Sequence, residues 1–536
     1  MTTTAVINLD VPGPRISRHV YGHFAEHLGR CIYEGIFVGE DSPIPNVRGM
    51  RTDVVEALRA LDIPNLRWPG GCFADEYHWR DGVGPHEDRP TVVNTHWGNV
   101  VEDNSFGTHE FMDLVDQLGC EPYICGNVGS GTVREMADWV EYLTRSGEAP
   151  MSRLRRANGR DEPWQVKFWG IGNESWGCGG NMRAEHYVDL ARQYSTYCRE
   201  HDGNELYKIA GGANIDDYHW TETLMKTLGD LGCGCNPRHF FDAISLHSYT
   251  FPGDYEQKQS ALDFDAAAYY DTIRSAWRTD ELLTRHGNVM DVYDPKKRIG
   301  LVMDEWGTWF SVEPGTNPGF LFQQNTMRDA LVAAVHFDSF HRHADRLVMA
   351  NIAQVVNVLQ AVLLTEGDRL VRTPTYHVFE MNKAHQDADS LTVSWTGQAV
   401  PTTTVGTKTV PLISASASTK DGYALISLSN LDLDNAHTVR LDLRGHDVAE
   451  ISSRILTTPG IADHNTPDHP DVVVPQPFEV DAITEGKLVI ELPAHSFVTL
   501  RLTLVQACPG SGRGLRYRVG PEHQTAPASR GRRSTA

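Results

Sequence analysis

Two apolar runs of the same design stand out in this chain: Lys167-Phe-Trp-Gly-Ile-Gly-Asn-Glu-Ser-Trp176 and Gly300-Leu-Val-Met-Asp-Glu-Trp-Gly307. Each run is strand-like and leads to a carboxylic acid, Glu174 or Glu305, with a tryptophan within the next two positions. A carboxyl group at the end of a buried strand is costly to place, because burial disfavours its charge, but it is useful for chemistry. Two such acids, distant in sequence but alike in setting, indicate a carboxylate pair that acts on a sugar.

The two runs belong to a longer alternation of strand-like and helical patterns. The runs that we interpret as strands are 16–24, 64–68, 121–127, 166–174, 208–214, 241–249, 298–306 and 346–352. Apolar residues at helical spacing predict helices at 52–61, 108–118, 133–144, 184–198, 266–286 and 323–341. About eight strand–helix repeats predict a (β/α)8 TIM barrel over residues 16–380, with the catalytic groups at the C-terminal ends of its strands.

The pattern changes after the barrel. Short runs such as Tyr423-Ala-Leu-Ile-Ser-Leu-Ser-Asn430 alternate with Gly, Pro, Asp and Asn turns, and helical periodicity disappears. These features predict a β-sandwich over residues 381–506. Residues 507–536 are rich in Gly, Ser, Pro and Arg, so we expect a disordered tail; RNA binding by its arginines is the alternative, which the scarcity of aromatic residues disfavours.

Composition excludes several classes of protein. The chain has 536 residues and a formal net charge of −22, which argues against nucleic acid or an anionic membrane surface as a partner. It has no apolar run long enough to cross a bilayer and no secretory signal in its first residues. Nine cysteines in so long a chain predict free thiols in a cytoplasmic protein. We expect no metal or other cofactor, since Cys233-Gly-Cys235 lacks a second Cys/His pair nearby.

The candidate site residues lie where the predicted strands end: Glu26, Trp68, Asn127, Glu174, Asn214, His247, Tyr249, Glu305 and Gln354. A retaining glycosidase needs two carboxyls about 5–5.5 Å apart, one to attack the anomeric carbon and one to protonate the leaving oxygen. The fourth and seventh strands lie across the barrel mouth from each other, so Glu174 and Glu305 can flank one ring. Asn173 is a candidate donor to the sugar 2-hydroxyl. Four tryptophans are either platforms for the sugar or core residues: Trp97, Trp176, Trp306 and Trp309.

Two further motifs each allow a second functional interpretation that the sequence disfavours. His23-Phe-Ala-Glu-His27 matches the H-x-x-E-H pattern of some zinc peptidases, but that pattern needs a helix and here it follows a strand. We therefore expect Glu26 to bind substrate hydroxyls. Asn127-Val-Gly-Ser-Gly-Thr-Val-Arg-Glu135 is Gly-rich but lacks the phosphate-binding spacings, so it predicts a loop that shapes the pocket.

Five motifs, in this order, resemble glycoside hydrolase family 51, the α-L-arabinofuranosidases, over residues 5–505. They are Tyr21-Gly-His-Phe-Ala-Glu-His-Leu-Gly-Arg30, Arg67-Trp-Pro-Gly-Gly-Cys-Phe73, Trp169-Gly-Ile-Gly-Asn-Glu-Ser-Trp176, Ser245-Leu-His-Ser-Tyr249 and Val302-Met-Asp-Glu-Trp306. The resemblance implies that Glu174 is the acid/base and Glu305 the nucleophile. It also implies that the sugar pocket includes Glu26, Cys72, Trp97, Asn173, His247, Tyr249 and Gln354.

The resemblance has one departure at this pocket: many relatives carry at position 72 an asparagine that hydrogen-bonds the sugar, and cysteine is a weaker donor. For the fold, it implies that the sandwich is a jelly roll and that an N-terminal strand within residues 1–15 joins it. For the assembly, it implies a homo-oligomer, often a hexamer, that needs no metal.

We therefore expect a cytoplasmic, exo-acting, retaining enzyme that releases terminal arabinofuranose from arabinoxylan or arabinan oligosaccharides. The alternative in the same class is another retaining barrel glycosidase, such as a β-xylosidase or an endoglucanase. A carbohydrate-binding protein with an inactive site and a zinc peptidase are the alternatives from other classes.

Overall fold

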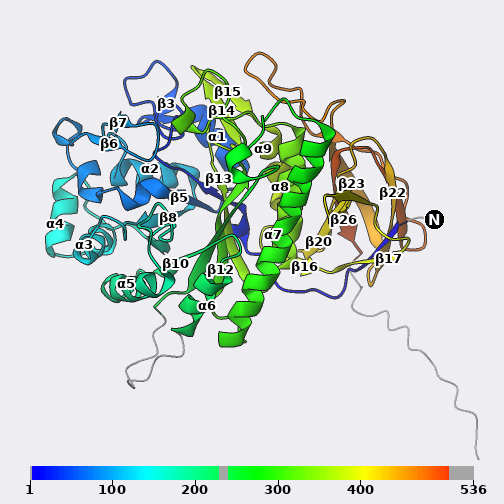
Figure 1. Ribbon diagram of the computed structural model, residues 1–536, viewed down its shortest axis with the longest axis horizontal. Helices are drawn as coiled ribbons and strands as arrows, with labels where there is room; N and C mark the ends of the chain where they lie inside the picture. The colour runs from blue at the N-terminus through cyan, green and yellow to red at the C-terminus, as the bar shows by residue number, and fades with distance from the viewer. Residues whose placement is uncertain (1–2, 228–239, 506–536) are drawn as a thin grey trace, which may run out of the picture.

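The computed structural model describes residues 3–227 and 240–505. Its larger part is a closed barrel of parallel strands that follow one another in chain order around the ring (Figure 1). The strands are β2 Gly22–Phe24, β5 Asn65–Trp68, β8 Glu121–Gly126, β9 Phe168–Ile171, β10 Tyr207–Asn214, β11 Ala243–Thr250, β12 Gly300–Thr308 and β13 Leu347–Ala353. The predicted (β/α)8 barrel is confirmed, because each of the eight predicted strands contributes one strand of the ring.

The first barrel strand is shorter than predicted. Residues Arg18–Tyr21 form a 3-10 helix, so the prediction of a strand from residue 16 is wrong over its first part. The Ser17 hydroxyl accepts a hydrogen bond from the His19 N–H at 3.2 Å. Such a local side-chain bond offers the backbone an alternative to strand pairing.

Nine α-helices are present in the described part of the chain. Six overlap predicted ones: α1 Thr52–Ala60, α2 Thr108–Leu118, α3 Val133–Thr144, α5 Ala184–Tyr197, α7 Ala266–Tyr293 and α8 Met327–Arg342. Three were not predicted: α4 Pro150–Ala157, α6 Tyr218–Lys226 and α9 Pro374–Asn382. Helix α8 starts four residues later than predicted, because Thr326 and Asp329 form a capping box that fixes its first turn.

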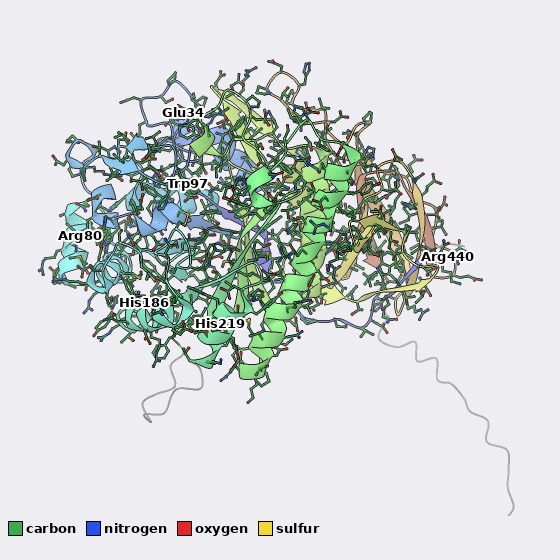
Figure 2. The ribbon with its side chains drawn as sticks, in the orientation of Figure 1. Glu34, Arg80, Trp97, His186, His219 and Arg440 are labelled. Carbon is green, nitrogen blue, oxygen red and sulfur yellow. A yellow bond between two sulfur atoms is a disulfide. The ribbon has the colours of Figure 1, made fainter. Side chains whose placement is uncertain are left out.

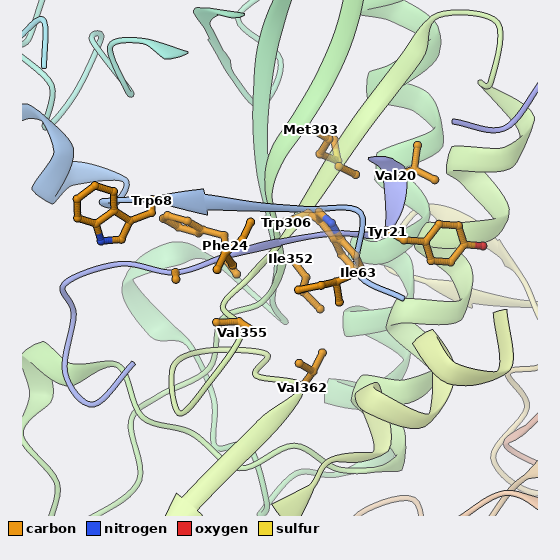
Figure 3. Close-up of a cluster of buried hydrophobic side chains, with 14 of the residues drawn as sticks. Val20, Tyr21, Phe24, Ile63, Trp68, Met303, Trp306, Ile352, Val355 and Val362 are labelled. Atoms are coloured by element: carbon orange, nitrogen blue, oxygen red, sulfur yellow. The ribbon is translucent and has the colours of Figure 1, made fainter. Parts of the chain in front are cut away.

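The barrel core is a large cluster of buried apolar and aromatic side chains (Figure 3). Trp306 lies inside it with 0% exposure, stacked on His336 at 4.9 Å between ring centroids. Trp68 is equally buried and stacks on Phe111 at 4.7 Å. Trp68 ends β5 and Trp306 lies within β12, and both side chains are in the core. Of the two alternatives for Trp306 the core position is therefore the correct one, and the prediction of Trp68 as a site residue is wrong.

The second part of the molecule is a sandwich of two sheets (Figure 1). One sheet has the order β17 Val393–Gly397, β1 Thr3–Asn8, β22 His437–Arg444 and β25 Lys487–Leu492. The other has the order β16 Asp389–Leu391, β20 Ile413–Lys420, β21 Tyr423–Asn430, β26 Ser496–Leu504, β23 Val448–Leu456 and β24 Gln476–Pro477. Strand β25 alternates exposed and buried residues, as expected for a strand with one face on a core. The predicted C-terminal sandwich is confirmed.

Short hairpins complete the described structure. They are β3 Asn46–Val47 with β4 Met50–Arg51, β6 Val92–Asn94 with β7 Val100–Glu102, β14 Leu363–Glu366 with β15 Arg369–Arg372, and β18 Thr402–Val405 with β19 Lys408–Pro411. No described helix has the length and apolar character to cross a membrane. The Cys233-Gly-Cys235 motif and the predicted tail at 507–536 lie outside the described residues.

Helix α8 lies between the barrel and the sandwich, where it packs on β12 and on β20, β21 and β26. The contact with the sandwich is polar as well as apolar. From α8, His341 Nδ1 lies 3.0 Å from Ser416 Oγ. His385, in the 3-10 helix Lys383–His385 that follows α9, bonds to Ser418 Oγ at 2.7 Å and to Ser427 Oγ at 3.0 Å. These groups are buried, so a neutral histidine with both nitrogens paired suits the interface.

This interface predicts a pH-dependent stability. Burial lowers the pKa of His385 to about 3. An unfolded histidine titrates near pH 6.5, so below that pH the unfolded state binds more protons and the free energy of unfolding should fall as the pH falls toward 3. Replacing the titrating ring in His385→Gln should make this decline shallower, by up to roughly 1.4 kcal/mol per pH unit once the pH is well below 6.5.

Urea unfolding of both proteins between pH 7 and pH 5 measures the two slopes. The exposed His446→Gln is the matched control and should keep the slope of the unmodified chain. An equally steep decline in His385→Gln would contradict the assignment of this histidine as a buried neutral group.

Candidate active site

Two glutamates meet at the C-terminal mouth of the barrel. Glu305 is in β12 and Glu174 follows β9, and one oxygen of each lies within 4.8 Å of the other and of a ring nitrogen of His247. Glu174 has a positive φ of 39°, which is uncommon for a residue other than glycine and tends to occur at functional sites. The separation of the two carboxyls is close to that of retaining glycosidases.

The Glu305 carboxylate is held at both oxygens by hydrogen-bond donors. Arg67 Nη1 donates to Oε1 at 2.8 Å, and the Tyr249 hydroxyl donates to Oε2 at 2.8 Å. Gly71 closes over the same group: a Cβ there would lie 2.7 Å from Glu305 Oε1, so the site needs glycine at this position. The guanidinium charge and both donors therefore hold this carboxyl in one orientation and complement a negative charge on it.

Glu174 has a different environment. Its Oε1 lies 2.8 Å from His247 Nδ1, while its Oε2 faces the sulfur atoms of Cys178 and Cys72 at 3.4 and 3.9 Å. Burial and the neighbouring charge of Glu305 raise the pKa of Glu174. Donation from His247 opposes this rise, but the two raising effects prevail, so the protonated form of Glu174 is favoured relative to a free glutamate.

His247 links the two glutamates to Asp304. Its Nε2 lies 3.0 Å from Asp304 Oδ1, and Asp304 Oδ2 accepts a hydrogen bond from the Tyr123 hydroxyl at 2.6 Å. Burial alone would lower the pKa of His247, but the charges of Glu305 and Asp304 outweigh it and raise that pKa to about 10. At neutral pH the ring is therefore a cation with a fixed orientation that donates from both nitrogens.

A third glutamate, Glu26, lies next to this pair at the end of β2. Its Oε1 accepts from the Gly71 and Phe73 backbones at 3.0 and 3.1 Å and from Trp97 Nε1 at 2.9 Å, and its Oε2 accepts from Gln354 Nε2 at 2.8 Å. Burial and the charge of Glu305 raise the pKa of Glu26 to about 7. Trp97 is only half-buried and lies in the part of the molecule away from the sandwich (Figure 2).

Two buried side-chain amides each have one atom without a hydrogen-bond partner in the described structure. Arg67 Nη2 donates to Asn173 Oδ1 at 2.6 Å, which leaves Asn173 Nδ2 without a partner in the described structure. Gln354 Oε1 is also unpaired there. Buried polar atoms without partners are rare and costly, so one free donor and one free acceptor beside three carboxyls indicate a site for a polar ligand.

The expectation of free thiols is wrong for two cysteines. Cys72 and Cys178 form a disulfide, whereas Cys31, Cys120, Cys125 and Cys198 are free. Cys72 therefore has no hydrogen to donate to a sugar, because a disulfide sulfur carries none. No local spacing marks this pair, since Cys178 is 106 residues from Cys72 and the two meet only through the fold of the barrel.

The other predicted site residues divide into two groups. Trp309 packs on Tyr249 at 4.9 Å between ring centroids and so borders the site. Trp176 donates from Nε1 to the Gly212 carbonyl at 3.0 Å and supports a neighbouring strand. Asn127 holds the loop after β8 through the Ser130 and Gly131 N–H groups, as its motif indicated, and the exposed Asn214 makes no contact with the two glutamates.

The H-x-x-E-H residues do not converge on one point. His23 packs on Phe379 at 4.8 Å between ring centroids, and His27 Nε2 accepts a hydrogen bond from Trp68 Nε1 at 3.2 Å. Glu26 points to the carboxylate site described above. The strand at this motif separates side chains that a helix would have placed on one face.

Several residues that support the site were not predicted from the sequence. Arg67 bridges Glu305 and Asn173, Asp304 orients His247, and Asp75 accepts from the Asn173 N–H at 3.1 Å. The sequence held a signal for Arg67 and Asp304, because a charged residue inside an apolar barrel strand is seldom placed there without a partner. Asp75 gave none, since it lies in the 3-10 helix Cys72–Asp75, beyond the strand.

Comparisons with known proteins agree with this geometry. Family models for the α-L-arabinofuranosidase 1 domain and the α-L-arabinofuranosidase C-terminal domain match residues 57–263 and 304–496. A Bacteroides ovatus protein named intracellular exo-α-L-arabinofuranosidase is 51% identical over 502 residues, which cover 94% of this chain and 96% of that protein.

Solved structures agree as well. A family 51 arabinofuranosidase from Xanthomonas axonopodis pv. citri has a TM-score of 0.90 and 49% identity, covering 94% of this chain and 99% of its own. An α-L-arabinofuranosidase from Thermotoga maritima, solved as an arabinose complex, has a TM-score of 0.80 and 30% identity, covering 93% and 99%. The chain therefore belongs to glycoside hydrolase family 51, the α-L-arabinofuranosidases.

Proposed function

We propose that this chain is an exo-acting, retaining α-L-arabinofuranosidase in which Glu305 is the nucleophile and Glu174 the acid/base. The observation that carries the proposal is the contrast between two carboxyls within 4.8 Å of each other. Glu305 receives a guanidinium and a phenol donor, whereas Glu174 faces two sulfur atoms and has a raised pKa. One group is thus prepared to attack as an anion and the other to give a proton.

In the first step, a Glu305 oxygen forms a bond to the anomeric carbon while the bond to the leaving oxygen breaks. Glu174 gives its proton to that oxygen, and a glycosyl ester on Glu305 results. The ester is neutral, so the charge that raised the pKa of Glu174 is gone and Glu174 can act as a base. It then takes a proton from water while the water oxygen attacks the anomeric carbon and the ester bond to Glu305 breaks. Arabinose leaves with its original configuration, and Glu305 is again a carboxylate.

The polar residues around the pair fit a furanose with several hydroxyls. The free Asn173 Nδ2 suits the 2-hydroxyl, where a hydrogen bond strengthens in the transition state. Glu26 and the free Gln354 Oε1 provide acceptors for other hydroxyls, and the half-buried Trp97 borders them. Tyr249 contacts the nucleophile itself and helps to orient it.

The relatives support the finer substrate assignment. The name of the Bacteroides ovatus protein describes an intracellular, exo-acting arabinofuranosidase, and the Thermotoga maritima enzyme was solved with arabinose. We infer a cytoplasmic enzyme that trims short arabinoxylan or arabinan oligosaccharides and works as a homo-oligomer. The net charge of −22 is compatible with such neutral substrates.

A panel of nitrophenyl glycosides tests this substrate assignment. The α-L-arabinofuranoside should have the highest kcat/KM, because the free polar atoms beside the carboxyls are set for one furanose ring. The β-D-xyloside and β-D-glucosides with the same leaving group should be slower by about 100-fold or more, which corresponds to the loss of two hydrogen bonds to buried groups. A xyloside that reacts faster would favour the β-xylosidase alternative, and binding of sugar without any turnover would favour an inactive binding protein.

The two glutamates should respond differently to replacement. Glu305→Ala should reduce kcat by about 10⁴-fold or more on every substrate, since no covalent step remains. Glu174→Ala should lose less on a nitrophenyl substrate, whose leaving group needs little protonation, and added azide should restore turnover by attacking the glycosyl ester, which gives an α-glycosyl azide. Kinetics with and without azide, and NMR of the product, measure both effects. Equal losses in the two variants, with no azide product, would refute the roles assigned here.

Arg67 should be irreplaceable by lysine. The guanidinium bonds to both Glu305 and Asn173, and a single ammonium cannot make both contacts. Arg67→Lys should lower kcat/KM on the arabinofuranoside roughly 100-fold, as expected when a buried charged contact is broken. The matched control is Arg80→Lys at a surface ion pair with Asp138, which should be fully active (Figure 2). An Arg67→Lys variant as active as the control would contradict the proposed support of the nucleophile.

A further inference from the structure

A disulfide lies against the proposed acid/base. Cys72 begins the 3-10 helix Cys72–Asp75 after β5, and Cys178 is in the loop that follows Glu174. Their sulfur atoms are the contacts of Glu174 Oε2, at 3.9 and 3.4 Å. Both cysteines are half-buried at the barrel mouth, so reagents in solution have a route to the bond.

We propose that the Cys72–Cys178 disulfide is a positioning element for Glu174, and that opening it impairs proton transfer by this residue. The proposal rests on the function assigned above to Glu174. It goes beyond that function because it makes the rate of the enzyme depend on the redox state of two residues that do no chemistry on the sugar.

Hydrogen bonding at Glu174 depends on whether the two sulfur atoms carry hydrogen. A disulfide sulfur has no hydrogen, so the two sulfurs surround Glu174 Oε2 without donating to it. In the described structure the one donor to this carboxyl is His247, at the other oxygen. Oε2 is therefore the oxygen that can hold the proton. Reduction places an S–H group on each sulfur, and a donor to Oε2 stabilises the carboxylate and so favours loss of that proton.

The backbone is anchored on both sides of Glu174. On the N-terminal side, Asp75 accepts from the Asn173 N–H at 3.1 Å and from the Val128 and Gly129 N–H groups at 2.8 Å each. On the C-terminal side, the disulfide joins the loop to the same 3-10 helix. Opening the disulfide leaves the Asp75 bonds in place, so it should loosen the loop after Glu174 without unfolding the barrel.

The loop itself is tightly packed. The Gly177 and Gly179 N–H groups donate to the Glu174 carbonyl at 2.7 and 3.1 Å. A Cβ on Gly179 would lie 2.6 Å from Asp75 Oδ2. A small shift of this turn is therefore felt at Glu174, because the carbonyl of this residue is the acceptor that the turn is built on.

The charged and titratable groups that face Glu174 come from several elements. His247 and Tyr249 lie in β11, Glu305 in β12 and Arg67 in β5, and Tyr255 lies beyond β11. The disulfide adds no charge to this set. A change in the pH profile on reduction, with these groups in place, would therefore come from the new S–H donors and the released loop.

The chemical step is an ordinary thiol–disulfide exchange. A dithiol reductant gives two electrons and two protons: the S–S bond breaks, two thiols form on Cys72 and Cys178, and the dithiol closes to its cyclic disulfide. Oxidation of the two thiols reverses the change. No other co-reactant is required.

The test uses the full-length enzyme in three states: as oxidised, after dithiothreitol under argon, and after reoxidation. Thiol titration verifies that reduction exposes two more thiols. The pH dependence of kcat/KM is then measured for the nitrophenyl arabinofuranoside and for an unactivated arabino-oligosaccharide. The reduced enzyme should be about tenfold slower on the unactivated substrate and less affected on the activated one. The alkaline limb of its profile should move to lower pH, and reoxidation should restore both.

Variants guard against an unspecific effect of the reductant. Cys178→Ser should reproduce the behaviour of the reduced enzyme and should not respond to dithiothreitol. Cys120→Ser, a half-buried free cysteine that precedes β8 at the opposite end of the barrel, is the matched control and should behave as the unmodified chain. The thermal midpoint is recorded for each, so that assays are made well below unfolding.

The possible results distinguish a failure of the proposed function from a failure of the positioning role of the disulfide. If the oxidised enzyme does not cleave arabinofuranosides, or if Glu174→Ala acts normally on the unactivated substrate, the proposed function fails. If both of those hold while two new thiols leave the rates and the pH profile unchanged, the positioning role alone is wrong. Equal slowing on both substrates with an unmoved alkaline limb would indicate general loosening and would also overturn it.

Discussion

Two carboxyl groups whose oxygens lie within 4.8 Å of each other are difficult to keep in a largely buried site. If both were charged they would repel each other strongly, and if both were neutral neither could attack carbon. The neighbouring residues give the two carboxyl groups different environments, so that one is favoured as the anion and the other as the acid. Arg67 and Tyr249 stabilise charge on Glu305, while burial and the charge of Glu305 raise the pKa of Glu174. The rest of the site supports this difference.

The barrel makes the pairing possible at low conformational cost. Glu174 and Glu305 come from β9 and β12, which are separated around the ring, yet their strand ends meet at one mouth. His247 from β11 and Arg67 from β5 connect these strands through hydrogen bonds, so four barrel strands hold one cluster. The sandwich does not contribute to that cluster. It covers the outer side of α8, and the buried histidines there serve the packing between the two parts.

The sequence predicted those features that depend on local pattern. Alternating strand and helix periods identified the barrel, because its strands are buried and its helices are amphipathic, and acids at strand ends identified Glu174 and Glu305. The predicted start of the first strand was wrong because the Ser17 hydroxyl bonds to the backbone at His19. Hydrophobic periodicity does not reveal such a bond. For Trp306 the pattern left a sugar platform and a core position open. Successive residues of a strand point to opposite sides, so the residue after Glu305 points into the shell of helices.

Contacts between distant segments were outside the reach of pattern reasoning. Cys72 and Cys178 lie 106 residues apart, and only closure of the barrel brings them together beside Glu174. Asp75 binds three backbone N–H groups from two other loops, and none of these partners is marked in the sequence. Arg67 was part of a motif, but its double role at Glu305 and Asn173 follows from the geometry of the ring.

Glu305 should form a covalent bond to the sugar, whereas Glu174 should not. Mass spectrometry of the enzyme labelled with a 2-deoxy-2-fluoro arabinofuranoside that carries a good leaving group tests this most directly, because the fluorine slows release of the intermediate. One fluoropentosyl group should be added per chain, on the peptide that contains Glu305. A label on the peptide that contains Glu174, or steady turnover of the arabinofuranoside by a protein that no such reagent labels, would contradict it.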